Sequence, residues 1–203
     1  GRRLARDAFD ALAPLAEAGW RVVTYDQRGQ HETPGGPPPG EVVTAESYAL
    51  PELALDLLAV VRATGTGPVH VVGHSFGGLV SREAVLTAPE TFASLTLLSS
   101  GPSGVGGDTA ELAHVFATAL ESFPIEQVWE AKVAYDAANG LHLPDDAALA
   151  DFLRSRFVAN DPASLASFAR QLTTAPDRTE ELAGTGLPVL VMYGEWDDAW
   201  PPA

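Results

Sequence analysis

Ser75 stands in a Gly-x-Ser-x-Gly pattern that residues 73–78 spell as GHSFGG. An apolar run at 68–72 precedes the pattern and a helical pattern follows it, so a strand must turn sharply into a helix at the serine. We expect Gly73 and Gly77 to be glycines because side chains would clash at such a turn. The hydroxyl of Ser75 would then be exposed at the start of a helix, whose dipole favours developing negative charge. This context predicts a nucleophile, and the alternative is a Gly/Ser-rich turn without chemistry.

A serine nucleophile indicates one class of reaction. It supports acyl transfer to water through a covalent ester intermediate and a tetrahedral oxyanion. Hydrolysis of an ester, an amide, an aminopeptide bond or a carbon–carbon bond would all use it. The residue type therefore predicts the mechanism and leaves the substrate open.

The elements that would position Ser75 alternate along the chain. Apolar patterns predict strands at 20–25, 68–72, 92–98 and 187–193, and helices at 2–18, up to about 63, and from Ser75 to Thr87. Alternating strands and helices favour a parallel sheet with helices on both faces, and ligands bind such sheets beyond the carboxyl ends of the strands. Ser75, Asp26 and the segment after 187–193 all follow strands, so we expect three loops to meet at one crevice.

Residues 101–186 show a different pattern, with short helices and no convincing strand. Helix starts are predicted at Asp108, which forms a capping box with Glu111, and at Pro124, Pro144 and Asp161-Pro162. Aromatic residues gather here, namely Phe116, Phe123, Trp129, Tyr135, Phe152, Phe157 and Phe168. They either pack the small core of this insertion or line an apolar substrate pocket beneath a lid, and the two interpretations are compatible.

Composition excludes several other functions. The chain has 203 residues and a net charge of −15, which disfavours binding to nucleic acid or to an anionic membrane surface. It has no cysteine, so thiol catalysis, disulfides and cysteine metal sites are excluded. No apolar run approaches the roughly 20 residues of a membrane span, and no phosphate-binding or dinucleotide motif is present. We therefore expect no metal, no cofactor and a cytoplasmic location.

Three motifs together resemble the α/β-hydrolase family with a helical cap. They are Tyr25-Asp26-Gln27-Arg28-Gly29, the Gly-x-Ser-x-Gly turn at 73–78, which this family calls the nucleophile elbow, and the segment 194–201 (GEWDDAWP). The first is similar to the motif of proline iminopeptidases, although the chain departs from that subgroup at 30–33 (QHET). The resemblance implies a doubly wound, mostly parallel α/β sheet. It also implies a core at 1–100 and 185–203, interrupted by a helical cap at 101–184.

The resemblance also implies roles for individual residues. Ser75 would be the nucleophile, and Asp197 would be the acid that holds a catalytic histidine, with Asp198 as substitute and a solvated acidic loop as the other interpretation. The backbone N–H of Phe76 would supply half of an oxyanion hole. The elbow would comprise Gly73, His74 and Gly77, with His74 as supporting structure, and the substrate pocket would include Trp129, Phe116 and Trp196. We expect Asp26 and Arg28 to pair and order their own turn.

The histidine base is not found where the family places it. All five histidines (His31, His70, His74, His114 and His142) precede Asp197, whereas the family's base follows the acid. We expect His31 and His142 to be loop residues. We also expect the sequence to be an internal part of a longer hydrolase that lacks early and late strands. Without a base the serine would be a weak nucleophile, and unpaired sheet edges would promote association.

The aromatic-rich insertion favours a small or medium apolar ester or amide as substrate. Two alternatives stay open: an acyltransferase, which differs only in the acceptor, and a ligand receptor that uses the fold without turnover. A small-molecule substrate is the only partner that the sequence predicts, and it gives no indication of an oligomeric state.

Overall fold

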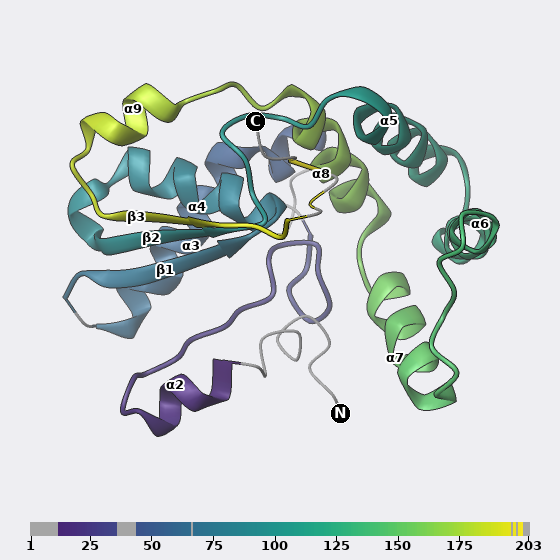
Figure 1. Cartoon of the computed structure of the whole chain (residues 1–203), viewed down its shortest axis with the longest axis horizontal. Helices are drawn as coiled ribbons and strands as arrows, with labels where there is room; N and C mark the ends of the chain where they lie inside the picture. Colours follow the sequence, from purple (N-terminus) through teal and green to yellow (C-terminus); the bar gives the residue numbers. More distant parts are fainter. Residues whose placement is uncertain (1–11, 36–43, 66, 196, 198, 201–203) are drawn as a thin grey trace.

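The computed structural model describes residues 12–35, 44–65, 67–195, 197, 199 and 200. Figure 1 shows a parallel sheet with helices packed against it, and a separate group of helices, α5 to α8, lying beyond one end of the strands. The three described strands lie side by side in the sheet in their order along the chain. The predicted parallel α/β architecture is therefore confirmed.

The three strands end in line with one another. They are β1 (Val69–His74), β2 (Phe92–Leu98) and β3 (Val189–Met192), and all neighbours are parallel. The last residue of β1, His74, pairs with Leu98, which in turn pairs with Met192. Because the three carboxyl ends coincide, the loops that begin at Ser75, Ser99 and Tyr193 leave the same edge of the sheet.

One hydrophobic core lies between the sheet and its helices. Helices α3 (Leu50–Thr64) and α4 (Phe76–Thr87) pack on each other, and α4 packs on β1 and β2. Pro51 lies in the first turn of α3, where its missing N–H costs nothing. Short elements complete this part: η2 (Ala45–Tyr48), η3 (Pro89–Thr91) and α9 (Thr179–Gly184), a helix that the sequence patterns did not predict.

The helices beyond the sheet form a second group with their own buried cluster. They are α5 (Gly107–Ser122), α6 (Ile125–Ala138), α7 (Ala147–Val158) and α8 (Pro162–Thr174). Asp161 caps α8 as predicted, by accepting the N–H of Ala163 at 2.9 Å. Two predicted starts are wrong. The α5 helix begins earlier, so Asp108 lies in its first turn rather than at its cap, and the cap of α7 is Asp146 rather than Pro144.

The amino-terminal part departs most from the prediction. Residues 20–25 are not a strand, because no neighbouring strand hydrogen-bonds to them among the described residues, and Trp20 and Val23 are exposed instead. Of the helix predicted at 2–18, the structure describes only α2 (Ala13–Glu17), and residues 1–11 lie outside the described part.

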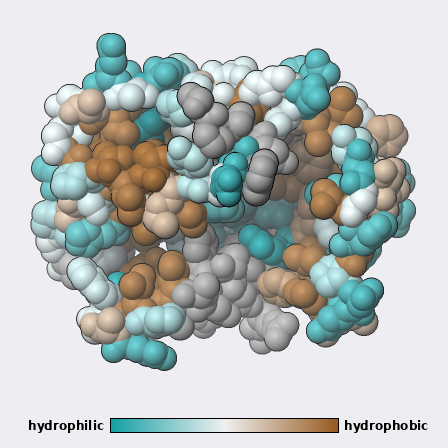
Figure 2. Space-filling model, in the orientation of Figure 1, coloured by the Kyte–Doolittle hydropathy of each residue, from teal (hydrophilic) through white to brown (hydrophobic). Residues whose placement is uncertain are grey.

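The β3 strand is exposed along its whole length. From Val189 to Tyr193 each side chain is 39 to 53 % accessible, and all are apolar or aromatic. A hydrophobic patch accordingly lies within the left part of the face in Figure 2, where Figure 1 places this strand. Among the described residues, no helix combines the length and apolarity that a bilayer span requires.

Candidate active site

Ser75 occupies a strained turn between β1 and α4. Its φ of 51° and ψ of −126° lie in a region that residues with a Cβ rarely adopt. The turn is held from both sides, because the N–H of Ser75 donates to the carbonyl of Leu98 at 2.9 Å and its own carbonyl accepts from Gly78 N–H at 2.8 Å. The hydrogen bonds to β2 and α4 therefore hold Ser75 in a backbone conformation that is unfavourable by itself. This conformation places the Ser75 hydroxyl at the start of α4.

The glycines around the turn have different roles. A Cβ on Gly73 would lie 2.5 Å from the carbonyl oxygen of Gly77 and 2.6 Å from the Cα of Gly78, so no side chain fits there. Gly78 is equally constrained, because a Cβ would collide with the side chain of Ser100. The expectation for Gly77 is wrong, since the nearest atom to its Cβ position is the Gln27 amide nitrogen at 3.9 Å. Steric crowding thus requires Gly73 and Gly78, and Gly78 was not identified from the sequence.

Phe76 links the turn to the second group of helices. It is the first residue of α4, so its backbone N–H has no carbonyl within the helix to bond. Its ring stacks on Phe168 of α8, with centroids 4.7 Å apart and planes inclined by 25°. The side chain that follows Ser75 is therefore fixed by an aromatic residue from α8.

Asp197 lies in a tight turn after β3. Its carboxylate accepts the backbone N–H groups of Trp200 at 2.9 Å and of Ala199 at 3.1 Å. The bond from Trp200, together with weaker contributions from the Ser99 hydroxyl and the charge of His74, holds the pKa of Asp197 below its usual value. The acid is thus anchored and stays ionised at neutral pH.

Ser99 connects the two predicted catalytic loops, and sequence reasoning missed it. It follows β2, has a φ of 43°, and donates its N–H to Met192 of β3 at 2.7 Å. Its hydroxyl helps to lower the pKa of Asp197, while the preceding carbonyl, that of Leu98, accepts the N–H of Ser75. The only sequence signal is its position directly after a strand, which pairs it with Ser75 once the register is known.

The histidines lie apart from this arrangement. His70 bonds to the Ser94 hydroxyl at 2.7 Å, and His31 has a φ of 48° with its Nε2 buried 4.0 Å from Glu32. His114 on α5 and His142 in the loop between α6 and α7 are exposed. His74 faces solvent at the end of β1 and affects Asp197 only through its charge. Within the described residues, no histidine hydrogen-bonds to Ser75 or Asp197.

The loop after residue 25 attaches the second group of helices to the sheet. The expected pair between Arg28 and Asp26 is wrong. Arg28 instead donates two hydrogen bonds to the carboxylate of Asp56 in α3, at 2.6 and 2.7 Å. Asp56 is the better partner because its carboxylate accepts two parallel hydrogen bonds from the planar guanidinium group of Arg28. Gly29 has a φ of 79°, and its carbonyl accepts the N–H of Asp161 at 2.7 Å.

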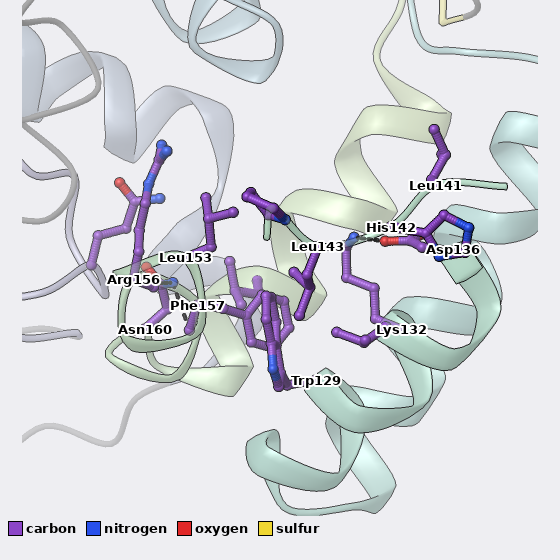
Figure 3. A pocket seen from close by; sticks show the side chains of 14 residues that line it. Trp129, Lys132, Asp136, Leu141, His142, Leu143, Leu153, Arg156, Phe157 and Asn160 are labelled. Carbon is purple, nitrogen blue, oxygen red and sulfur yellow. Dashed lines mark hydrogen bonds and ion pairs between the residues drawn. The ribbon is translucent and has the colours of Figure 1, made fainter. Parts of the chain in front are cut away.

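A cavity of about 490 Å³ opens among α6, α7 and the start of α8. Figure 3 shows Trp129 and Phe157 at its apolar wall, with the Lys132–Asp136 ion pair and Arg156 at its rim. Of the predicted pocket residues, Trp129 lines this cavity, whereas Phe116 packs behind Phe157 at a centroid distance of 6.0 Å. Trp196 and Asp198 lie outside the described residues. The described residues contain no group of three histidine or acidic side chains arranged to hold a metal ion.

Comparisons with known proteins show the family to which this fold belongs. The family model "alpha/beta hydrolase fold" matches residues 5–124, more than half of the chain. The chain belongs to the α/β-hydrolase family. Among solved structures, a carboxylesterase of Nitrososphaera gargenis aligns with a TM-score of 0.78 at 22 % identity, over 98 % of this chain and 70 % of that protein. A hydrolase from Pseudomonas aeruginosa aligns with a TM-score of 0.71 at 26 % identity, over 96 % of this chain and 69 % of that protein.

Several curated sequences similar to this α/β-hydrolase carry the name "Putative carbamate hydrolase RutD". The protein from Variovorax paradoxus is 39 % identical over 89 residues, which are 44 % of this chain and 31 % of that protein. The one from Pseudomonas syringae is 28 % identical over 142 residues, or 64 % of this chain and 49 % of that protein. These matches thus cover about a third to a half of the length of the relatives.

Proposed function

We propose that the protein is a serine hydrolase in which Ser75 attacks the carbonyl carbon of a small to medium apolar ester, amide or carbamate. The observation that carries the proposal is the strained turn at Ser75, which is fixed by β2 and closed to any side chain at Gly73. Membership of the α/β-hydrolase family supports the reaction class. The names of the similar proteins add carbamates to the candidate substrates.

The proposed chemistry proceeds in two steps. The Ser75 oxygen bonds to the carbonyl carbon while its proton passes to a base, and the Phe76 N–H stabilises the resulting oxyanion. The leaving group then departs with that proton, and water hydrolyses the ester formed on Ser75. Asp197, ionised and anchored, would orient a histidine base and stabilise its charged form. No described histidine lies in that place, so we infer that these 203 residues alone turn over poorly.

The proposed domain organisation places a cap beside the nucleophile. Residues 1–100 and 185–203 would form the catalytic core, and 101–184 would form the cap. The stacking of Phe168 on Phe76 supports this, because it brings α8 against the residue that follows the nucleophile. We propose that Trp129, which lines the cavity, contacts the substrate together with Trp196, and that Phe116 supports the pocket wall through Phe157.

The test is turnover by the protein as its gene encodes it. We expect hydrolysis of short p-nitrophenyl esters, and of carbamate and amide analogues, at rates that differ with the acyl group. Ser75→Ala should lower kcat by at least about a thousandfold. Ser122→Ala, which changes an exposed serine at the end of α5, should leave it unchanged.

Two outcomes would contradict the proposal. Equal activity in Ser75→Ala and the wild type would assign the reaction to another residue. Tight binding of substrate analogues without turnover would favour a receptor that uses the hydrolase fold. Transfer of the acyl group to an added alcohol in preference to water would support the same nucleophile while making the protein an acyltransferase.

A further inference from the structure

One short segment touches both predicted catalytic loops. Residues 99–104, here called the bridge loop, follow β2 directly. At its start, Ser99 donates its N–H to β3 at Met192, next to the Leu98 carbonyl that holds Ser75. At its end, the N–H of Gly104 donates to Ala175, just beyond α8, at 2.8 Å. The bridge loop is therefore the place where the nucleophile turn, the acid turn and the end of α8 meet.

Trp200 fixes the acid turn to the bridge loop. Its indole N–H donates to the backbone carbonyl of Ser103 at 2.9 Å. Its ring lies directly against Gly101, where a Cβ would collide with the indole carbons and nitrogen. A glycine at this position is therefore required by the ring, and the ring is held by both a hydrogen bond and close packing.

Trp200 is hydrogen-bonded through its backbone to Asp197. The backbone N–H of Trp200 donates to Asp197 Oδ1, and the N–H of Asp197 donates to Gly194 at 3.1 Å. The Ser99 hydroxyl, at the start of the bridge loop, also helps to lower the pKa of this carboxyl group. Movement of the indole would consequently move one of the donors that define the position of the carboxylate.

Arg82 fixes the same loop to the nucleophile helix. It lies on α4, is only 2 % exposed, and donates from one terminal nitrogen to the carbonyl of Pro102. Its Nε and other terminal nitrogen are buried without a hydrogen-bond partner. Because burial of a cation with unsatisfied donors is unfavourable, stability alone does not account for an arginine at this position. Its one hydrogen bond instead attaches the bridge loop to the helix that begins after Ser75.

We propose that Trp200 and Arg82 are positioning residues: together they clamp the bridge loop and thereby fix the Asp197 carboxylate relative to the nucleophile helix. The catalytic consequence of this clamp rests on the proposed function. The clamp itself does not, so it can be tested without turnover.

The test is an NMR titration of the Asp197 carboxyl carbon in the folded chain, assigned by comparison with Asp197→Asn. Trp200→Phe removes the indole donor, and Gly101→Ala displaces the ring. Both should raise the Asp197 pKa, because the hydrogen bonds that favour the carboxylate loosen. Arg82→Met should raise it too, while melting within about 4 °C of the wild type, since it loses one bond together with two unsatisfied donors.

Matched controls separate positioning from general destabilisation. Ser103→Ala keeps the backbone carbonyl that accepts the indole N–H, so the Asp197 pKa should not change. His74 at the end of β1, and Tyr193, Glu195 and Asp198 in the sequence that follows β3, are further titratable groups close to Asp197 in the fold or the sequence, and all are retained in every variant. Ser99→Ala, which deletes a single hydroxyl, should raise the pKa in a chain whose packing is otherwise intact.

The outcomes are distinct from those of the hydrolase test. An Asp197 pKa that is unchanged in Trp200→Phe, Gly101→Ala and Arg82→Met, with each variant folded, would overturn the clamp whatever the activity. In the protein as its gene encodes it, Trp200→Phe should lower kcat about tenfold or more with little change in KM. A lowered kcat with an unchanged Asp197 pKa would also contradict the clamp, because the defect would then lie elsewhere.

Discussion

Gly73 and Gly77 flank Ser75, but only Gly73 lies where the fold leaves no room for a side chain. Gly73→Ala would place a methyl group against the backbone of α4, which cannot move without disrupting the helix. We expect it to lower the free energy of unfolding by about 2–4 kcal/mol and to abolish the reactivity of Ser75. Gly77→Ala meets nothing within 3.9 Å inside a helix and should be neutral or stabilise the fold by up to about 1 kcal/mol. Chemical denaturation of both variants is the measurement, and equal losses would contradict the steric account.

The contribution of Asp197 to the stability of the fold should depend on pH. Its pKa is lowered in the fold from an ordinary value of 3.8, chiefly by the Trp200 N–H. A carboxyl of this kind stabilises the fold above its unfolded pKa, and the contribution disappears as the pH falls through the folded pKa. We therefore expect the stability difference between the wild type and Asp197→Asn to be constant near neutral pH and to shrink below about pH 4. Urea unfolding across this range would show it, and a difference independent of pH would argue against an anchored carboxylate.

Among the elements, α8 depends on a polar contact at its first turn. The Tyr48 hydroxyl, from η2, donates to the Asp161 carboxylate at 2.5 Å, and burial, together with this hydrogen bond, raises the pKa of Tyr48. Tyr48→Phe leaves a carboxylate without this donor and should destabilise the fold by about 1–3 kcal/mol. Tyr135→Phe, on the exposed side of α6, is the control and should change stability by less than about 0.5 kcal/mol. If thermal melts show equal shifts for the two variants, the docking contact is unimportant.

The elements also show how far sequence reasoning reaches. The turn at Ser75 and the strand at 92–98 were predicted because their signals are local: alternating apolar residues, and glycines at a strand-to-helix turn. Ser99 and Trp200 were missed because their roles arise only when three distant loops meet at one sheet edge. The predicted strand at 20–25 failed for a related reason, since β-forming residues make a strand only when a neighbouring strand is there to pair with. Arg28 found its acidic partner on α3, which no spacing within its own loop could reveal.

On the scale of the whole molecule, exposed β3 is the main liability of the chain. Its apolar side chains, 39 to 53 % accessible from Val189 to Tyr193, form an edge that another strand can join. We expect the 203-residue chain to associate as its concentration rises, and Leu190→Lys to reduce the association. Leu112→Lys, which adds the same charge on exposed α5, should have much less effect. Light scattering after size-exclusion chromatography would measure this, and a monomer at every concentration would refute it.

The most direct test of the catalytic assignment is covalent capture of the nucleophile. A fluorophosphonate probe should modify the gene-encoded protein once, and peptide mass spectrometry should locate the adduct on Ser75. The 203-residue chain should react at least about a hundredfold more slowly if it lacks its base. Loss of the adduct in Ser75→Ala and its retention in Ser122→Ala would agree with the account. An adduct on another residue, or no adduct on the folded gene-encoded protein, would contradict it.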